Sequence, residues 1–106
     1  MMELSTAGII SIMEIAEKMS HNPARRFKIR NRGFIREGYY ADLVLVDPVN
    51  PYTVNEENIL YKCGWSPFEN HKFPHSISKT MVNGKIVFDG DNIIEKDAAM
   101  PLKFER

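Results

Sequence analysis

The Asn83–Gly84 pair constrains the fold of this chain more than any other feature. It lies between two runs rich in β-branched and apolar residues, within the stretch ISKTMVNGKIVFDG. A two-residue type I′ turn needs positive φ at both central positions, and Asn-Gly is its favoured sequence. The alternation of apolar and polar residues along both runs fits strands that share one covered face. The sequence therefore predicts a β-hairpin over residues 77–88.

A second strand is expected at residues 43–46, which read LVLV. Asp42 and Asp47 flank this run, and Pro48 stops it. A run so short and so apolar is typical of a strand that is buried on both faces. The two acids are expected to bond to backbone amides or to pair with arginine.

Two helices are expected ahead of the strands. Ser11 and Glu14 have the spacing of a capping box at the start of a helix over residues 11–20. Asn22 and Pro23 then suit the cap and the first position of a second, short helix over 23–28. The first helix carries an apolar stripe at helical spacing, formed by Ile12, Ile15, Ala16 and Met19.

These elements leave the predicted sheet without enough cover. The chain has 106 residues, which allows one domain at most and a modest core. Such a small sheet, with a fully apolar strand, has trouble covering both faces, and the helices could cover only one. We therefore expect an exposed apolar sheet face that either finds another part of a longer polypeptide or drives self-association.

Charge and composition exclude several classes of protein. The net charge is zero, so the whole molecule offers no electrostatic attraction to nucleic acid or to a membrane. No apolar run approaches the ~20 residues of a membrane span, and no leader sequence is recognised. One cysteine rules out an internal disulfide framework and suits a reducing, cytoplasmic compartment.

Residues 21–40 are nevertheless rich in positive charge. This stretch holds Arg25, Arg26, Lys28, Arg30, Arg32 and Arg36, against Glu37 alone. A nucleic-acid patch has a similar composition. We favour solvated arginines at helix ends, or arginines that pair with acids elsewhere in the chain, because we expect no aromatic residue or Gly-rich loop to be interleaved with them.

No cluster of side chains predicts catalysis or metal binding. His71 and His75 have zinc-binding spacing on a helix, but Pro74 lies between them, so we expect loop or surface histidines. Cys63 has neither a base nor further ligands beside it, and we interpret it as a small buried hydrophobe. Trp65 and Phe68 are then interpreted as an aromatic plug that folds over one end of the sheet.

Four stretches are familiar when they are taken together. They are NPA at 22–24, RGFIREGYYADLVLVD at 32–47, YKCGWSPFE at 61–69 and T-x-VNGKIV at 80–87. In combination they resemble the C-terminal end of a bacterial dihydroorotase, in the amidohydrolase superfamily. The first two stretches are shared with hydantoinases and allantoinases, whereas YKCGWSPFE is more specific to dihydroorotases. The resemblance covers about residues 8–88.

The resemblance implies an α+β fold class. One or two N-terminal helices, the end of the helical layer of a (β/α)8 barrel, would precede a small, mainly antiparallel sheet with its hairpin at Asn83–Gly84. This sheet would be part of the composite β-domain of an amidohydrolase, with the catalytic barrel mostly absent. The implied division is 1–30 for the barrel helices, 31–90 for the β-domain and 91–106 for a weakly patterned tail with a mobile end.

The resemblance also implies an activity for the parent enzyme. Dihydroorotases interconvert N-carbamoyl-L-aspartate and dihydroorotate in pyrimidine biosynthesis, with zinc held by an HxH pair, a carboxylated Lys, two further His and an Asp. This sequence contains no HxH pair, and its three histidines match none of those motifs. We therefore expect no catalytic, cofactor-binding or metal-binding residue here, and no activity of the chain alone. Zinc and the small-molecule substrate would bind only in the full-length enzyme, with the N-terminal part of the parent chain as partner.

Two alternatives remain open. The chain could be a fragment of a hydantoinase-like or allantoinase-like cyclic amidase, although the CGWSPFE stretch argues against that. It could also be a stand-alone, non-enzymatic module that serves the assembly of a complex.

Overall fold

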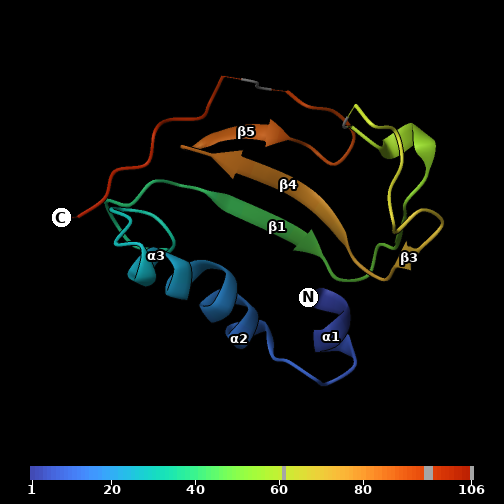
Figure 1. Cartoon of the computed structure of the whole chain (residues 1–106), viewed down its shortest axis with the longest axis horizontal. Coiled ribbons are helices and arrows are strands. Elements are labelled where there is room, and N and C mark those ends of the chain that lie inside the picture. The colour runs from blue at the N-terminus through green and yellow to red at the C-terminus, as the bar shows by residue number, and fades with distance from the viewer. Residues whose placement is uncertain (61, 95–96, 106) are drawn as a thin grey trace.

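Short helices precede two small antiparallel sheets in the computed structural model, which describes residues 1–60, 62–94 and 97–105 (Figure 1). The elements are α1 Met2–Thr6, α2 Ile12–Ala16, η1 Glu17–His21, α3 Asn22–Arg26, β1 Leu43–Asp47, β2 Tyr52–Thr53, η2 Glu56–Asn58, β3 Lys72–Phe73, β4 Ser76–Val82 and β5 Lys85–Phe88. The expected α+β class with antiparallel sheets is confirmed. Within these described ranges, no helix has the length and apolar character needed to cross a membrane.

The first predicted helix is present as α2 and η1, and it begins at the predicted capping box. The Ser11 hydroxyl accepts a hydrogen bond from the Glu14 N–H at 3.1 Å, and the Ser11 N–H donates to the Glu14 carboxylate at 3.4 Å. The prediction that Asn22 caps a second, separate helix is wrong. Asn22 has helical dihedrals, and its N–H donates to the Glu17 carbonyl, so the helical stretch continues through it. Pro23 has no N–H to give, and the wider π-helical turn of η1 accommodates that loss.

The helical stretch ends two residues earlier than predicted, at Arg26. Lys28 adopts a positive φ of 53°, and the Ile29 N–H donates to the Ala24 carbonyl at 2.9 Å. The Lys28 N–H also donates to the Arg25 carbonyl at 3.3 Å. These two bonds form a Schellman motif, which turns the chain away from the helix axis.

The three-stranded sheet has the order β1-β4-β5, with antiparallel neighbours. The predicted hairpin is confirmed, with Asn83 at φ 51° and Gly84 at φ 81° between β4 and β5. Val44, Thr80 and Phe88 are direct partners across the three strands and so share one face. A smaller sheet pairs β2 with β3.

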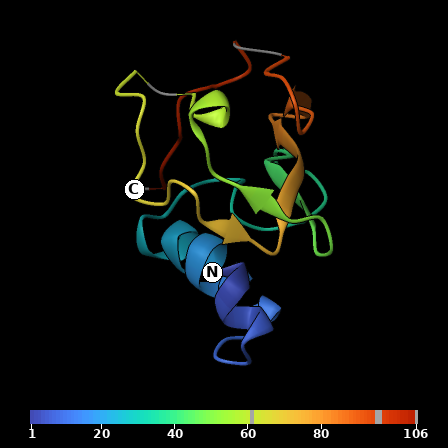
Figure 2. The ribbon, with the colours of Figure 1, turned by 90° about the vertical axis from the view of Figure 1, so that its right-hand side faces the viewer.

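The strand over 43–46 is present, but its predicted burial on both faces is wrong for this chain. β1 stands at the edge of the sheet and pairs with β4 alone among the described strands. Val44 and Leu45 are 55% and 56% exposed. Figures 1 and 2 show the N-terminal helices, α1 to α3, grouped together on one side of the sheet, next to β1. β1 is exposed because the chain has too few residues to cover it. This agrees with the apolar sheet face that was expected to be exposed.

The hydrophobic core is correspondingly small. Among the described residues, the buried hydrophobic side chains are those of Ala24 and Ala98. The apolar stripe predicted for the first helix is not covered either, since Ile12 is 65% and Met19 is 60% exposed. Apolar burial therefore contributes little to holding the helices against the sheet.

A polar joint connects the helical stretch to the sheet instead. Arg32 is buried and forms an ion pair with Asp42, directly before β1. The other carboxylate oxygen of Asp42 accepts a hydrogen bond from the Asn83 N–H at 2.9 Å. The Asn83 side chain in turn donates to the Ala98 carbonyl at 2.5 Å. The Arg32 guanidinium also lies over the Tyr40 ring, 4.2 Å from its centroid.

The tail returns to the helical stretch, which its weak sequence pattern did not indicate, and the mobility of its end stays a prediction. The Arg30 N–H donates to the Lys103 carbonyl, and the Glu105 N–H donates to the Lys28 carbonyl, each at 2.8 Å. These bonds fix the described part of the tail beside the end of α3, whereas 95, 96 and 106 lie outside the described residues. The division at 30 and 90 stays a prediction.

Gly33 packs so closely against the helix that it provides a test of this arrangement. A Cβ at Gly33 (φ 85°) would lie 2.5 Å from the Ala24 Cβ and 2.9 Å from the Ser20 carbonyl oxygen. We predict that Gly33→Ala lowers the free energy of unfolding by about 2–5 kcal/mol, through left-handed strain and overpacking. Gly38→Ala is the matched control, because Gly38 has φ 83° and nothing within 4 Å, so only the strain of about 1–2 kcal/mol applies. Denaturant unfolding measures both losses, and equal losses would contradict the packing of Gly33 on the helix.

Candidate functional site

The stretch with the single cysteine and tryptophan is not a plug. Cys63 is a free, exposed thiol, and its sulfur lies 3.7 Å from the Trp65 carbonyl oxygen. Trp65 is 60% and Phe68 is 56% exposed. Both the buried-hydrophobe reading of Cys63 and the plug are therefore wrong for this chain, because it supplies no apolar layer for the aromatic side chains to cover. Tyr61, the first residue of the stretch, lies outside the described residues.

Two histidines connect α1 to the strands. A His71 ring nitrogen lies 2.7 Å from the Glu3 carboxylate. His75 approaches the Thr6 hydroxyl at 2.6 Å and donates its other ring N–H to the Pro48 carbonyl at 2.9 Å. The expected place of these histidines, in loops at the surface, is confirmed for His71, which is exposed, and His75 is half-buried.

These histidines do not converge on a common point. Within the described residues, no group of three or more His, Cys, Asp or Glu side chains lies in an arrangement that could hold a metal ion. His21 is engaged elsewhere, stacked on the Phe34 ring. The described residues therefore do not fit a zinc centre, and the absence of catalytic residues from the chain stays a prediction.

The acids at the strand ends have structural partners. Asp42 pairs with Arg32, and Asp47 accepts a hydrogen bond from the Val49 N–H at 3.1 Å, as predicted for both. At the end of β5, hydrogen bonds from the backbone N–H groups of Asn92 and then Asp91 lower the pKa of Asp89.

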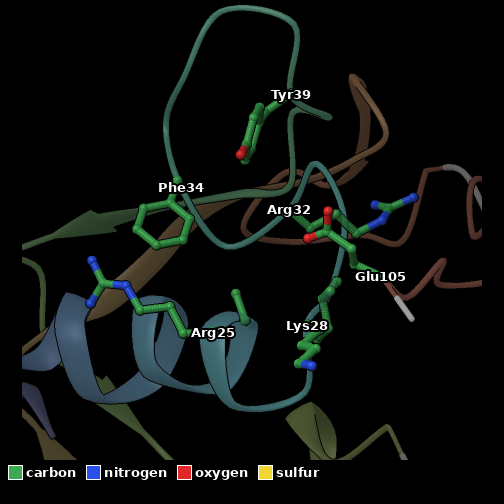
Figure 3. A pocket seen from close by; sticks show the side chains of 8 residues that line it. Arg25, Lys28, Arg32, Phe34, Tyr39 and Glu105 are labelled. Carbon is green, nitrogen blue, oxygen red and sulfur yellow. The ribbon is translucent and has the colours of Figure 1, made fainter.

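The structure instead forms a pocket between α3 and the loop over 33–39 (Figure 3). Its volume is about 230 Å³. It is lined by Ala24, Arg25, Lys28, Ile29, Arg32, Phe34, Tyr39 and Glu105. Three of these side chains are cationic, and the Glu105 carboxylate is the single acid among them. The helix, the following loop and the returning tail each contribute to the lining.

An aromatic ring organises the cations at one side of this pocket. The Phe34 ring stacks on His21, with centroids 4.4 Å apart and planes at 6°. The guanidinium carbon of Arg36 lies 4.2 Å from the Phe34 centroid, and that of Arg25 lies 5.1 Å from it. Tyr39 meets the same ring edge-on. Cation–π attraction of this kind holds guanidinium groups in place without neutralising them.

The expectation of solvated or acid-paired arginines is confirmed, since Arg25, Arg26, Arg30 and Arg36 are exposed, and the aromatic contacts add to it. Arg32 pairs with an acid, as expected. Arg25 and Arg36 lie on an aromatic ring, and in the described part of the chain no carboxylate approaches either of them within 4.0 Å. The available signal was Phe34 and Tyr39, which alternate with the arginines in RGFIREGY. The expectation that no aromatic residue is interleaved with the arginines is therefore wrong.

Comparison with known protein families gives one match that covers most of the chain. The model of the amidohydrolase family matches residues 1–87. This range contains every helix and nearly every strand residue of the structure.

Curated relatives also match over most of the chain. Dihydroorotases from Pyrococcus horikoshii and Thermococcus kodakarensis are 43% and 33% identical over 84% and 96% of this chain. An allantoinase from Rubrobacter xylanophilus is 35% identical over 87% of it. The chain spans only 21%, 25% and 20% of these three relatives, in the same order.

A solved structure shares the fold. The L-hydantoinase (dihydropyrimidinase) from Arthrobacter aurescens superposes with a TM-score of 0.76 at 24% identity. The match covers 86% of this chain and 20% of the hydantoinase chain. At this identity the likeness concerns the fold alone.

Proposed function

Because this chain belongs to the amidohydrolase family, we propose that it is the C-terminal portion of a dihydroorotase. That enzyme interconverts N-carbamoyl-L-aspartate and dihydroorotate, a step of pyrimidine biosynthesis. The identity to dihydroorotases, up to 43% over most of the chain, carries this proposal. The YKCGWSPFE stretch adds support, since it resembles dihydroorotases more than other cyclic amidases.

In this proposal the chain is a structural part of a hydrolase. Residues 1–30 belong to the helical layer of the barrel, 31–90 form part of the composite β-domain, and 91–106 follow as a tail. Zinc, its ligands and the proton-transferring acid belong to polypeptide outside these 106 residues, because the described histidines are engaged with Glu3, Thr6 and Phe34.

The first alternative is a related cyclic amidase. The allantoinase relative at 35% identity favours it, and the NPA and ADLVLVD stretches resemble allantoinases and hydantoinases as well. A stand-alone assembly module is the second alternative, and the exposed apolar side chains of β1 favour that reading.

A complementation experiment tests the proposed function. The Pyrococcus horikoshii dihydroorotase, truncated to remove the segment that matches this chain, is expected to be inactive because its fold is incomplete. Co-expression with this chain is predicted to restore the hydrolysis of dihydroorotate, measured by the loss of its ultraviolet absorbance. This chain alone is predicted to give no turnover, with or without added zinc.

The matching segment of the Rubrobacter xylanophilus allantoinase is the control. It should restore less activity than this chain does, because its contact residues would fit a different barrel. Equal restoration by both segments would favour the broader cyclic-amidase reading. Turnover by this chain alone, in proportion to its concentration, would contradict the proposal.

We also propose that the exposed faces have a polypeptide partner. Val44 and Leu45 on β1, and Ile12 and Met19 on the helical stretch, are more than half exposed. Exposed apolar surface of this kind favours association in water. The proposed partner is the N-terminal part of the parent chain, and in its absence a second copy of this chain.

Self-association is therefore predicted for the isolated chain. Multi-angle light scattering should give a mass that rises above 12.2 kDa with concentration. The double variant Val44→Thr, Leu45→Thr keeps β-propensity while removing apolar area, and it should shift the mass toward the monomer. A monomer at every soluble concentration would contradict this prediction.

The free thiol and the net charge indicate the compartment and the partners of this protein. We place the protein in the cytoplasm, because Cys63 is a free thiol that a reducing compartment preserves. With a net charge of zero, neither nucleic acid nor a membrane is proposed as a partner.

A further inference from the structure

The pocket between α3 and the loop over 33–39 is assigned no role in the proposed hydrolysis, and the charges of its described lining residues are not balanced. Arg25 and Lys28 line it, and among the described residues neither has a carboxylate within 4.0 Å. Arg32 is neutralised by Asp42, which lies outside the lining. Among the described lining residues, Glu105 is the acid that stands against Arg25 and Lys28, so this part of the lining has an excess of positive charge.

The position of Arg25 suits an anchoring role. Figure 3 shows its side chain extending along the wall of the pocket toward Phe34, while the Lys28 side chain points away from the other labelled residues. Contact with the Phe34 ring restricts the guanidinium group before any ligand arrives. Because less side-chain entropy is then lost on binding, a held arginine binds an oxyanion more effectively than a mobile one.

The size of the pocket limits what it can hold. A volume of about 230 Å³ lies below the ~300–1,000 Å³ of pockets for drug-sized ligands. It suits a single oxyanion group or a short carboxylic acid. An extended polyanion such as nucleic acid would need a longer groove with further phosphate contacts.

The tail contributes a competing charge. The Glu105 N–H donates to the Lys28 carbonyl, and this bond fixes the residue at the pocket. In Figure 3 the Glu105 carboxylate extends from the tail toward the space below Tyr39. A negative group at this place weakens the attraction of the pocket for a second anion.

We propose that this pocket is a binding site for a small oxyanion, a carboxylate or a phosphate, in which Arg25 is the anchor and Glu105 is an internal competitor. The inference goes beyond the proposed function, because that function assigns no role to the lining residues of this pocket. It assigns a role to the arginine-rich stretch that sequence composition alone left open.

The test is a titration of this chain with inorganic phosphate, and separately with acetate, followed by the shifts of backbone amide signals in NMR. Sodium chloride at matched ionic strength is the reference, because salt screens exposed charges. The saturable shifts are expected at residues of α3 and of the loop over 33–39. Preference for phosphate or acetate then identifies which oxyanion the site takes.

Three variants are expected to change the affinity for the anion in different ways. Arg25→Gln should weaken binding at least about fourfold, the factor for one unit charge at about 5 Å in bulk water. Glu105→Gln should tighten binding, and it lies in the tail, where loss of the fold is not expected. Arg26→Gln is the matched control, since Arg26 does not line the pocket, and it should leave the affinity unchanged.

Arg25→Lys separates the loss of charge from an effect on folding. It keeps the positive charge, so it should retain part of the binding that Arg25→Gln loses. The proposal is overturned if neither anion gives saturable shifts, or if Arg26→Gln weakens binding as much as Arg25→Gln does. It is also overturned if Glu105→Gln fails to tighten binding.

Discussion

The ion pair between Arg32 and Asp42 is the contact on which the rest of this structure depends. Arg32 is 7% exposed, and a buried guanidinium group is costly unless a carboxylate neutralises it. Asp42 stands directly before β1 and also accepts the Asn83 N–H at the hairpin turn. The helical stretch, the edge strand and the hairpin therefore meet at one carboxylate. With Ala24 and Ala98 as the buried hydrophobic residues described, apolar packing provides little alternative support.

The open apolar surfaces follow from the same shortage of residues. β1 has an apolar sequence, yet it lies at an edge with more than half of Val44 and Leu45 exposed. Exposed apolar edge strands are uncommon in native proteins, because their unpaired backbone groups can pair with other chains. The chain spans about a fifth of the length of most of the curated relatives it matches. Both observations agree with a segment whose surfaces are completed by further polypeptide, as proposed.

Local signals in the sequence predicted local structure well. The hairpin followed from the backbone preference of Asn83–Gly84, and the helix start followed from Ser11 and Glu14, within four residues of each other. Burial was predicted less well, because the exposure of Leu45 and Trp65 depends on what packs above them, and this chain does not provide it. The candidate pocket was missed for a similar reason. It forms only when the chain reversal after α3 and the returning tail bring Arg25, Phe34 and Glu105 together.

Replacing Asp42 by Asn tests most directly whether a polar joint, rather than an apolar core, holds the helices to the sheet. The variant keeps an oxygen for the Asn83 N–H but leaves Arg32 buried without its counter-charge. We predict a loss of about 2 kcal/mol in the free energy of unfolding, less than the ~3–5 kcal/mol of fully buried pairs because the Asp42 side chain is 35% exposed. Asp47→Asn, at the other end of β1, should cost less than about 0.5 kcal/mol. If both variants unfold at the same denaturant concentration as the unmodified chain, the account is contradicted.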